Sequence, residues 1–255
     1  MNARTTVLLT RPAGRNEALA ARLRAAGLDV TLAPALAIRH LSTARPQPSG
    51  GHLYLFVSRQ AVEAYFSAVR AQWPADAWAA AVGAATAQAL RAFVPPDRVL
   101  VPAEDEAPDS ESLLAIIDAR ALAPGEAHIL RARQGRDWLA DQLRSRGWAV
   151  TCHALYERVA ALLPGAVCET LAMPTGGIVL LATSLEALDA IDGSLRHYRL
   201  EWPARLELVT LHARIARRLQ CWYADRPPDA LHTTLSAPDD AALFQTILAA
   251  SRLLH

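Results

Sequence analysis

The sequence predicts an α/β protein of two similar domains, each a parallel sheet flanked by helices. Short apolar runs, which suit strands buried on both faces, alternate with segments of helical periodicity. Four stretches of the first half recur in the second half in the same order, after 120 to 130 residues. A repeat of this length indicates duplicated domains, because solenoid repeats run to only about 20–50 residues. The 255 residues also suffice for one or two domains with sizeable cores.

The chain opens with a predicted strand, helix and strand. The first strand is Thr6 to Thr10, and a helix with apolar residues at helical spacing follows from about Gly14 to Ala26. Gly27 ends that helix, and Leu28 to Leu32 forms the second strand. The segment from Ser42 to Gly51 contains two Pro and two Gly, so we expect a linker there and a point where the chain can change domain.

A βαβ alternation follows the linker. Its expected elements are a strand at 53–57, a helix at 60–71, a strand at 78–82, a helix at 84–93 and a strand at 98–101. An acidic loop at 103–109 comes next. Ser110 is expected to cap the helix after it, whose apolar face carries Leu113 and Ile117.

The second half repeats these units. The opening unit recurs at 128–153, where Gly147 matches Gly27. Three further matches, the last two of them weaker, pair 53–62 with 179–188, 80–90 with 209–219 and 108–117 with 238–247. Residues 161–177, which hold two Pro and a Gly pair, are expected to form another connection, and strand, helix and strand return from Ile178.

Composition excludes several classes of protein. The 26 basic residues balance 25 acidic ones, so the chain lacks the basic surplus of a nucleic-acid-binding protein. All the basic residues are Arg and none is Lys, which argues against a Schiff-base enzyme, a pyridoxal-phosphate enzyme and a phosphate-binding loop that depends on its Lys. The first strand is not followed by a glycine fingerprint, which disfavours a nucleotide-dependent enzyme on the same kind of sheet.

Cysteine and histidine usage indicates a reduced compartment and no metal site. Cys152, Cys168 and Cys221 are odd in number and widely spaced, so neither a disulfide framework nor a thiolate metal site is expected. The eight His residues include no i, i+4 pair with the Glu that a zinc hydrolase needs. No signal peptide or membrane span is visible, so we expect a cytoplasmic protein with no membrane partner.

Small polar and basic residues follow the expected carboxyl ends of strands, where ligands of parallel sheets bind. The positions are Thr10-Arg11, Ser58, the turn 83–86 with Thr86, the loop 131–135 with Arg131 and Arg133, Thr183-Ser184, and 212–214 with His212 and Arg214. Backbone N–H groups and hydroxyls at helix starts are good anion receptors. For Ser58, Thr86 or Ser184 alone, a simple helix cap is the commoner role. Six such ends on a two-lobed chain favour a cleft that receives an anion.

The order and spacing of these motifs resemble the uroporphyrinogen-III synthase family over nearly the whole chain. The residues that carry the resemblance are Thr10-Arg11-Pro12, 27–34, 56–62, 81–87, 110–114, 130–136, 146–150 and Tyr156-Glu157-Arg158. Each motif alone is weak, because apolar strands that end in Ser or Gly are common. Their order and spacing are the specific part.

The resemblance implies two α/β domains joined by a two-stranded connection. The chain would leave the first domain after its opening unit and return when the second is complete. By that pattern, domain one comprises residues 1–38 and 174–255, and domain two comprises residues 39–173. The repeat is compatible with this division, since the two copies of each unit would lie in different domains.

The resemblance also implies a reaction. The family closes hydroxymethylbilane, a linear tetrapyrrole with eight carboxylates, into a macrocycle while it inverts the last pyrrole ring, with loss of water and without a cofactor. The pyrroles are electron-rich, so the protein must mainly hold one folded conformation of the substrate and stabilise developing charge. We therefore expect a lyase of haem biosynthesis that acts as a monomer on this small molecule.

Tyr156 is the catalytic residue that the resemblance implies. It matches a Tyr that the family carries between its domains, and its hydroxyl can donate a proton or a hydrogen bond to the leaving hydroxyl. A phenol is a weak acid, so orientation of a water that acts as the donor is an open alternative. Packing as an interface aromatic is another.

The remaining site residues are expected to bind carboxylates. The hydroxyls that the resemblance assigns to this role belong to Ser58, Thr86, Thr183 and Ser184. Arg11, Arg131 and Arg133 are expected to add charge-assisted hydrogen bonds, although Arg on a solvated loop is the commoner situation.

Two loops depart from the family pattern. The second copy of the 83–86 turn lacks its Gly and its hydroxyl, and His212 and Arg214 are expected to attract carboxylates in their place. A helix cap is the alternative role for His212. Ala132 stands where relatives often have Gly, which restricts how closely an anion can approach the backbone.

A non-catalytic two-lobed binding or sensor module is the alternative function. The sequence shows no catalytic triad, metal motif or paired carboxylates, which favours this alternative. An exported binding protein would carry a signal peptide, and a cytosolic regulator would usually bring a DNA-binding segment. Neither is visible in the sequence.

Overall fold

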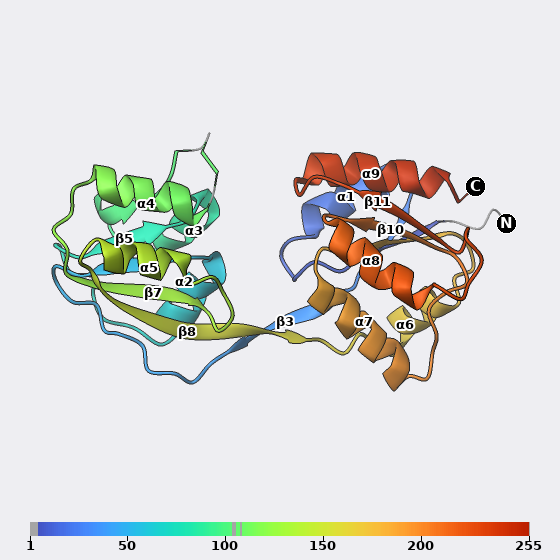
Figure 1. Cartoon of the computed structure of the whole chain (residues 1–255), viewed down its shortest axis with the longest axis horizontal. Helices are drawn as coiled ribbons and strands as arrows, with labels where there is room; N and C mark the ends of the chain where they lie inside the picture. The colour runs from blue at the N-terminus through green and yellow to red at the C-terminus, as the bar shows by residue number, and fades with distance from the viewer. Residues whose placement is uncertain (1–4, 104–105, 108, 255) are drawn as a thin grey trace. The chain divides into compact units, whose positions relative to one another are not determined.

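The computed structural model describes residues 5–103, 106–107 and 109–254, which fall into two compact units. Unit 1 comprises Met1–Ala37 and Val159–His255, and unit 2 comprises Ile38–Arg158. The chain crosses between the units twice, within the neighbouring strands β3 (Leu36–His40) and β8 (Ala149–Ala160), as Figure 1 shows.

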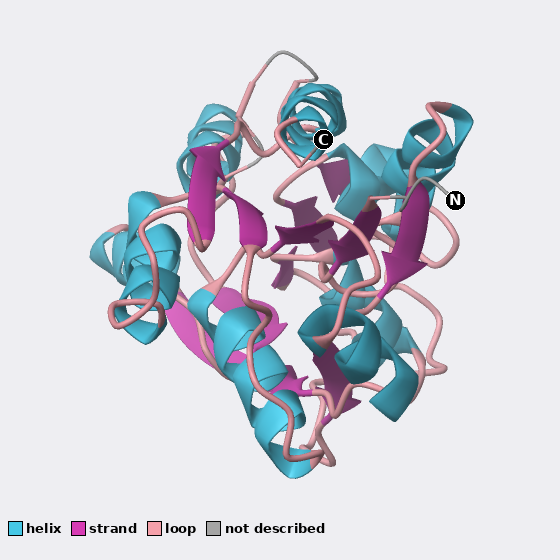
Figure 2. Ribbon diagram, turned by 90° about the vertical axis from the view of Figure 1, so that its right-hand side faces the viewer, coloured by secondary structure: helices cyan, strands magenta, loops and turns pink. Residues whose placement is uncertain are grey.

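Unit 1 is built on a five-stranded parallel sheet in the order β11-β10-β9-β1-β2. Its strands are β1 (Thr6–Leu9), β2 (Asp29–Leu32), β9 (Ile178–Leu181), β10 (Leu206–Thr210) and β11 (Leu231–Leu235). Its helices are α1 (Glu17–Ala25), α6 (Gly165–Ala172), α7 (Leu185–His197), α8 (Ala213–Trp222) and α9 (Asp240–Arg252). Helices flank the strands in Figure 2.

Unit 2 is built on a six-stranded sheet in the order β3-β8-β7-β4-β5-β6, in which the pairs from β8 to β6 are parallel. Its other strands are β4 (Leu53–Phe56), β5 (Trp78–Ala81), β6 (Val99–Leu100) and β7 (Glu126–Ala132). Its helices are α2 (Arg59–Phe66), α3 (Ala84–Leu90), α4 (Ser110–Ala119) and α5 (Trp138–Ser145), with a 3-10 turn η1 (Pro96–Arg98). Two parallel sheets flanked by helices confirm the predicted fold class.

The two sheets share one topology, which is the structural form of the sequence repeat. The unit 1 order β11-β10-β9-β1-β2 corresponds strand by strand to the order β6-β5-β4-β7-β8 in unit 2. Unit 2 has β3 in addition, beside β8. Helix starts repeat as well. Asp109 and Asp239 cap α4 and α9, and each carboxylate accepts the backbone N–H three residues later. The match of 108–117 with 238–247, one of the two weaker sequence matches, is therefore a structural match.

Both opening helices end in the same glycine turn. Gly27 and Gly147 have φ values of +88° and +87°, a left-handed conformation that costs a residue with a side chain roughly 1–2 kcal/mol. Their N–H groups donate to the carbonyls of Arg24 and Arg144. The guanidinium groups of these two Arg residues donate in turn to a carbonyl of the strand that follows. The predicted helix end at Gly27 is confirmed.

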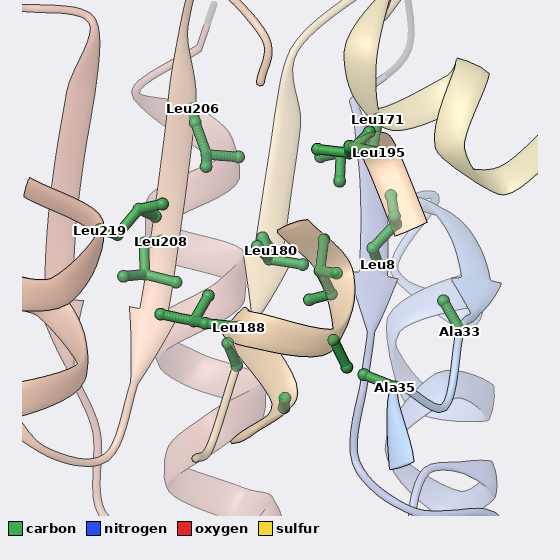
Figure 3. Packing of buried hydrophobic residues seen from close by; sticks show 14 of the residues in the cluster. Leu8, Ala33, Ala35, Leu171, Leu180, Leu188, Leu195, Leu206, Leu208 and Leu219 are labelled. Carbon is green, nitrogen blue, oxygen red and sulfur yellow. The ribbon is translucent and has the colours of Figure 1, made fainter. Parts of the chain in front are cut away.

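The central strands are buried on both faces, as their apolar runs predict. Leu8, Leu180 and Leu208 lie in register on β1, β9 and β10 and pack on one face of the sheet (Figure 3). Leu9 and Leu181 pack on the other face in a second core. All five are fully buried, and each such side chain contributes roughly 1.5–3 kcal/mol. In β9 every residue is apolar and buried.

Two helix starts differ from those expected. α1 begins at Glu17 rather than near Gly14, because Gly14 turns the chain at φ +82° and the Glu17 carboxylate accepts the N–H groups of Gly14 and Asn16. α4 is capped by Asp109 rather than Ser110, which is its first helical residue. A carboxylate is at least as good a cap as a hydroxyl, so the sequence did not distinguish these neighbours.

The segment 161–177 is more than a connection, since it contains α6. Cys168 and Leu171 of this helix are buried in the same core as Ile178 of β9. The compact units therefore change at Val159, earlier than the residue 174 expected from the sequence, because the apolar face of α6 packs in unit 1.

In the part of the chain that the structure describes, no helix is both long and apolar enough to cross a membrane.

Replacement of Gly27 by Ala should lower the free energy of unfolding by about 1–2 kcal/mol, because the left-handed backbone strains any side chain although the space around it is open. Gly193→Ala is the matched control. Gly193 lies inside α7 with open space around it, so Ala should raise the free energy of unfolding by about 0.5–1 kcal/mol. Urea unfolding followed by circular dichroism measures both, and changes of the same sign would contradict this account.

Candidate functional site

Ser58 and Tyr156 meet at the carboxyl edge of the unit 2 sheet. Ser58 follows β4 and caps α2, where its Oγ accepts the N–H of Ala61 at 3.1 Å. Tyr156 lies on β8 and is 2% exposed, and its hydroxyl is 2.9 Å from Ser58 Oγ. Ser58 is partly exposed, whereas the phenol that it contacts is buried. The capping hydrogen bond accounts for the position of Ser58 at the start of α2. Capping does not account for the contact between Ser58 and Tyr156.

Thr86 lies at the end of the neighbouring strand, β5. The cap of α3 is Gly83, whose carbonyl accepts the N–H of Thr86 at 3.0 Å. Thr86 is therefore a buried residue of the first helical turn, and a capping role is wrong for it. Thr86 and Ser58 thus follow neighbouring parallel strands at the same edge of the sheet.

The two candidate Arg residues at the carboxyl end of β7, Arg131 within the strand and Arg133 just after it, already have acidic partners. Arg131 pairs with Asp137 at 2.7 Å, and Arg133 pairs with Glu157 at 3.2 Å. Glu157 also accepts from Arg39, so one carboxylate holds two guanidinium groups beside Tyr156. Arg131 and Arg133 are thus at the expected edge, with part of their charge neutralised within the chain.

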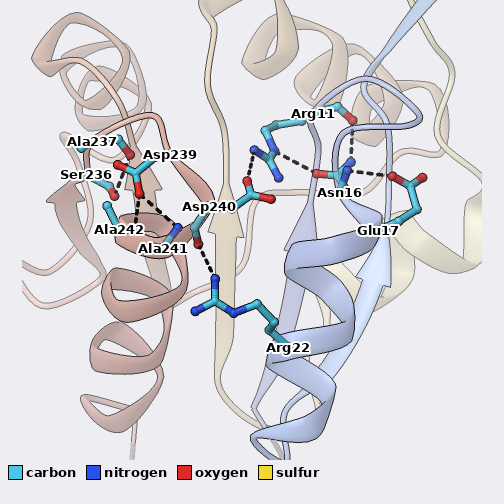
Figure 4. Close-up of polar contacts among 10 residues, drawn as sticks. All are labelled: Arg11, Asn16, Glu17, Arg22, Ser236, Ala237, Asp239, Asp240, Ala241 and Ala242. Carbon is cyan, nitrogen blue, oxygen red and sulfur yellow. Dashed lines mark hydrogen bonds and ion pairs between the residues drawn. The ribbon is translucent and has the colours of Figure 1, made fainter. Parts of the chain in front are cut away.

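Arg11 is the most constrained of the expected anion ligands (Figure 4). Its Nη1 pairs with Asp240 at 2.8 Å, and its Nε donates to the Asn16 side chain at 3.2 Å. Asn16 donates back to the carbonyl of Arg11 at 2.7 Å. Among the described atoms, Arg11 Nη2 is buried without a hydrogen-bond partner. The guanidinium group is therefore paired through Nη1 and Nε, whereas its Nη2 is buried and has no hydrogen-bond partner among the described atoms.

Thr183 and Ser184 follow β9 at the corresponding edge of unit 1. Ser184 caps α7 and accepts the N–H of Ala187 at 3.1 Å, the same distance as in the Ser58 cap. Thr183 is partly exposed beside it. For Ser184 the cap accounts for the hydrogen bond to Ala187, and no described side chain takes the place that Tyr156 has beside Ser58.

His212 and Arg214 lie at the start of α8 with exposed side chains. His212 occupies the cap position, but its side chain makes no capping hydrogen bond. Within the described ranges, neither side chain has an ion-pair partner. The capping alternative for the His212 side chain is wrong, and both groups are free to attract an anion.

The helix starts differ in whether an acidic side chain already accepts the free backbone N–H groups there. Glu17, Asp109 and Asp239 lie at the starts of α1, α4 and α9, where a carboxylate already uses the free N–H groups. Backbone N–H groups lower the pKa of the Glu17 carboxyl, from its own residue first and then from Gly14 and Asn16, and the Ser112 N–H lowers that of Asp109. The first turns of α2, α3, α6 and α8 hold no acidic residue. Of these four, the starts of α2, α3 and α8 carry the polar residues expected from the sequence and are suited to receive an external anion.

Sequence reasoning missed Asn16, Asp240 and Glu157 as parts of the site. Arg11 and Asp240 are separated by 229 residues, so no local pattern shows that they pair. Glu157 stood inside the Tyr156-Glu157-Arg158 motif, but its partners Arg39 and Arg133 become visible only when β3, β7 and β8 are placed together.

Comparison of the sequence with known proteins gives consistent matches. The family model "Uroporphyrinogen-III synthase HemD" matches residues 17–224. A uroporphyrinogen-III synthase of Salmonella typhimurium is 31% identical over 222 residues, which cover 83% of this chain and 89% of that protein. The Escherichia coli protein of the same name is 28% identical over 222 residues, with the same coverage.

Solved structures give the same fold. The crystal structure of uroporphyrinogen-III synthetase from Helicobacter pylori aligns with a TM-score of 0.56 at 16% identity and covers 96% of this chain and 99% of its own. A mutant uroporphyrinogen-III synthase from Thermus thermophilus aligns with a TM-score of 0.51 at 18% identity and covers 98% and 100%. At such identities the likeness concerns the fold, and it agrees with two helix-flanked sheets.

Proposed function

Because this chain belongs to the uroporphyrinogen-III synthase family, we propose that its substrate is hydroxymethylbilane and that Ser58 and Tyr156 act on it as a pair. The activity is that of the family, a hydro-lyase of tetrapyrrole biosynthesis. The 2.9 Å contact between the two hydroxyls carries the proposal.

The reaction needs little from the protein besides positioning and charge stabilisation. The terminal hydroxyl of the linear tetrapyrrole leaves as water, and the substituted position of the electron-rich last ring attacks the carbon that remains to give a spiro intermediate. The bond from that position to its original bridging carbon then breaks, and the bridging carbon rejoins the ring at its free position with loss of a proton, which leaves the ring inverted. A hydrogen bond to the leaving oxygen and a fixed substrate conformation lower the barrier to these steps. This chemistry calls for no cofactor and no strong nucleophile.

Ser58 is the group that meets the substrate in this proposal. Its Oγ accepts the Ala61 N–H, so its own proton is free to point toward either Tyr156 or a ligand. Tyr156 is too buried to reach a ligand directly, and its phenol can donate to Ser58 Oγ and leave the Ser58 proton directed outward. Tyr156 is then a positioning residue, which revises the role expected from the sequence.

Substrate carboxylates are assigned to the starts of α2, α3 and α8, whose first turns hold no acidic residue. Ser58 and Thr86 mark those of α2 and α3, and His212 and Arg214 mark that of α8. Free N–H groups and the helix dipole favour negative charge at each of them. A secondary role in carboxylate binding is assigned to Arg11, Arg131 and Arg133, because each already pairs with a carboxylate of the chain. Thr183 and Ser184 are also assigned a secondary role.

The proposal also covers organisation. We take the two compact units as the two domains, each with its own sheet and cores, and expect the enzyme to act as a monomer in the cytoplasm. The three Cys residues are free, in keeping with a reduced compartment.

The direct test supplies the purified protein with fresh hydroxymethylbilane and separates the oxidised product isomers. We expect the macrocycle with the inverted last ring. Product with only the uninverted ring, as in spontaneous closure, would overturn the assignment, and binding without turnover would favour a sensor module.

Tyr156→Phe should lower kcat about tenfold with KM nearly unchanged, because it removes one hydrogen bond worth about 1.4 kcal/mol in the transition state. Ser58→Ala should lower kcat at least as much, and the double variant should be no slower than Ser58→Ala, since the two hydroxyls act as one unit. Tyr65→Phe is the control, because this buried phenol donates to the Pro46 carbonyl. Additive losses, or a loss above about 100-fold for Tyr156→Phe, would instead make Tyr156 an independent acid.

Arg214→Glu should raise KM about tenfold or more, because it places a carboxylate at the start of α8 where a substrate carboxylate is expected. Arg217→Glu makes the same charge change one turn farther along the same helix, on another exposed residue, and should leave KM within about twofold. Steady-state kinetics with hydroxymethylbilane measures both. Equal rises in KM would reduce the effect to overall charge.

A further inference from the structure

A cluster of imidazoles lies at the amino edge of the unit 2 sheet, away from the groups considered so far. His52 Nδ1 is 3.1 Å from His128 Nε2, and His128 Nδ1 is 3.2 Å from His153 Nε2. A carboxylate oxygen of Glu126 and one ring nitrogen from each of His52 and His128 lie within 4.8 Å of one another. Three ligand atoms that metals favour therefore converge on one point.

The strand geometry explains why these groups converge. Glu126 and His128 are two residues apart on β7, so their side chains lie on the same face of the sheet. β4 pairs with β7 in the register Leu53 to Ala127, which places His52 beside Glu126. Glu126 and His128 from β7, with His52 from the neighbouring chain segment, therefore form a compact set of three ligands.

The surroundings orient the His128 ring toward this point. His128 is buried, and its Nδ1 lies 3.2 Å from His153 Nε2, which is the kind of outer hydrogen-bond partner that metal-binding His residues commonly have. The Tyr54 ring packs on His128 with centroids 4.8 Å apart. Tyr54 is itself fixed, because its hydroxyl donates to the Gln47 carbonyl.

We propose that His52, Glu126 and His128 bind one zinc ion, with His153 as the hydrogen-bond partner that orients His128. Two nitrogens each about 2.0–2.1 Å from a tetrahedral zinc are roughly 3.3 Å apart, close to the 3.1 Å between His52 and His128. Two imidazoles and one carboxylate form a ligand set that zinc uses in proteins. Glu126 is exposed, so the ion has a route from solvent and a fourth position for water.

The ion would stabilise the fold and take no part in the reaction. Six residues of extended chain separate His52 from Ser58 along β4, or about 20 Å at roughly 3.3 Å per residue. Zinc at this edge would tie β4 to β7. Binding to the folded state alone raises stability by mass action, about 2.7 kcal/mol at 100 times the Kd.

Zinc titration of the metal-free full-length protein, followed by calorimetry, tests the proposal. We expect about one zinc per chain and a higher melting temperature with zinc than with magnesium. Cobalt(II) should give the visible absorption of a tetrahedral site and be displaced by zinc. Glu126→Gln, at an exposed position, should weaken zinc binding at least tenfold without unfolding the protein, and His153→Gln should weaken it about 10–100-fold.

His40→Gln is the matched control, because His40 is an exposed His of the same unit outside the cluster, and zinc affinity should be unchanged. Zinc binding that is equally strong in wild type and Glu126→Gln would overturn the proposal. So would a loss of affinity in His40→Gln as large as in Glu126→Gln, or the absence of zinc binding by a folded wild-type chain, which would leave the His residues as a hydrogen-bonded core network.

Discussion

The whole arrangement depends on the parallel pairing of strands that are buried on both faces. β9 of unit 1 and β4 of unit 2 are buried at every position, so polar side chains have no place along them. Because neighbouring strands run in the same direction, their carboxyl ends gather at one edge of each sheet, where the helices that follow them begin. Each of those helices brings unpaired N–H groups to that edge. Such a helix start can receive an external anion only where no carboxylate of the chain already accepts hydrogen bonds from those N–H groups.

The two edges of the unit 2 sheet serve different purposes although the same strands form both. At the carboxyl edge, the Ser58 cap is extended by the Tyr156 hydroxyl, which gives a polar pair at the surface of an apolar core. At the amino edge, His128 of β7 lies in a chain of imidazoles with His52, which directly precedes β4, and His153 of β8. Rigid central strands hold both sets in place. Unit 1 repeats the scaffold, but its counterpart of Ser58, Ser184, has only the cap.

The sequence revealed the fold better than the site, for a physical reason. Periodicity, helix-ending Gly residues and the repeat are local or self-similar signals, and they predicted both sheets and most elements. Contacts across the sheet have no local signal. Ser58 and Tyr156 are 98 residues apart, and Arg11 and Asp240 are 229 apart. The i, i+4 spacing of a helical metal motif does not reveal Glu126 and His128, which show the i, i+2 spacing of a strand.

The division of unit 1 into two sequence segments sets an order of events during synthesis. Unit 2 is continuous from Ile38 to Arg158, whereas β1 ends at Leu9 and its partner β9 begins only at Ile178. At about 5–20 residues per second the ribosome needs roughly 10–30 s to close that interval. The sheet of unit 2 is complete in the nascent chain before β9 exists. Until then β1 can pair with β2 and pack against α1, but the edge that pairs with β9 stays open, so an apolar strand edge is exposed to aggregation throughout that interval.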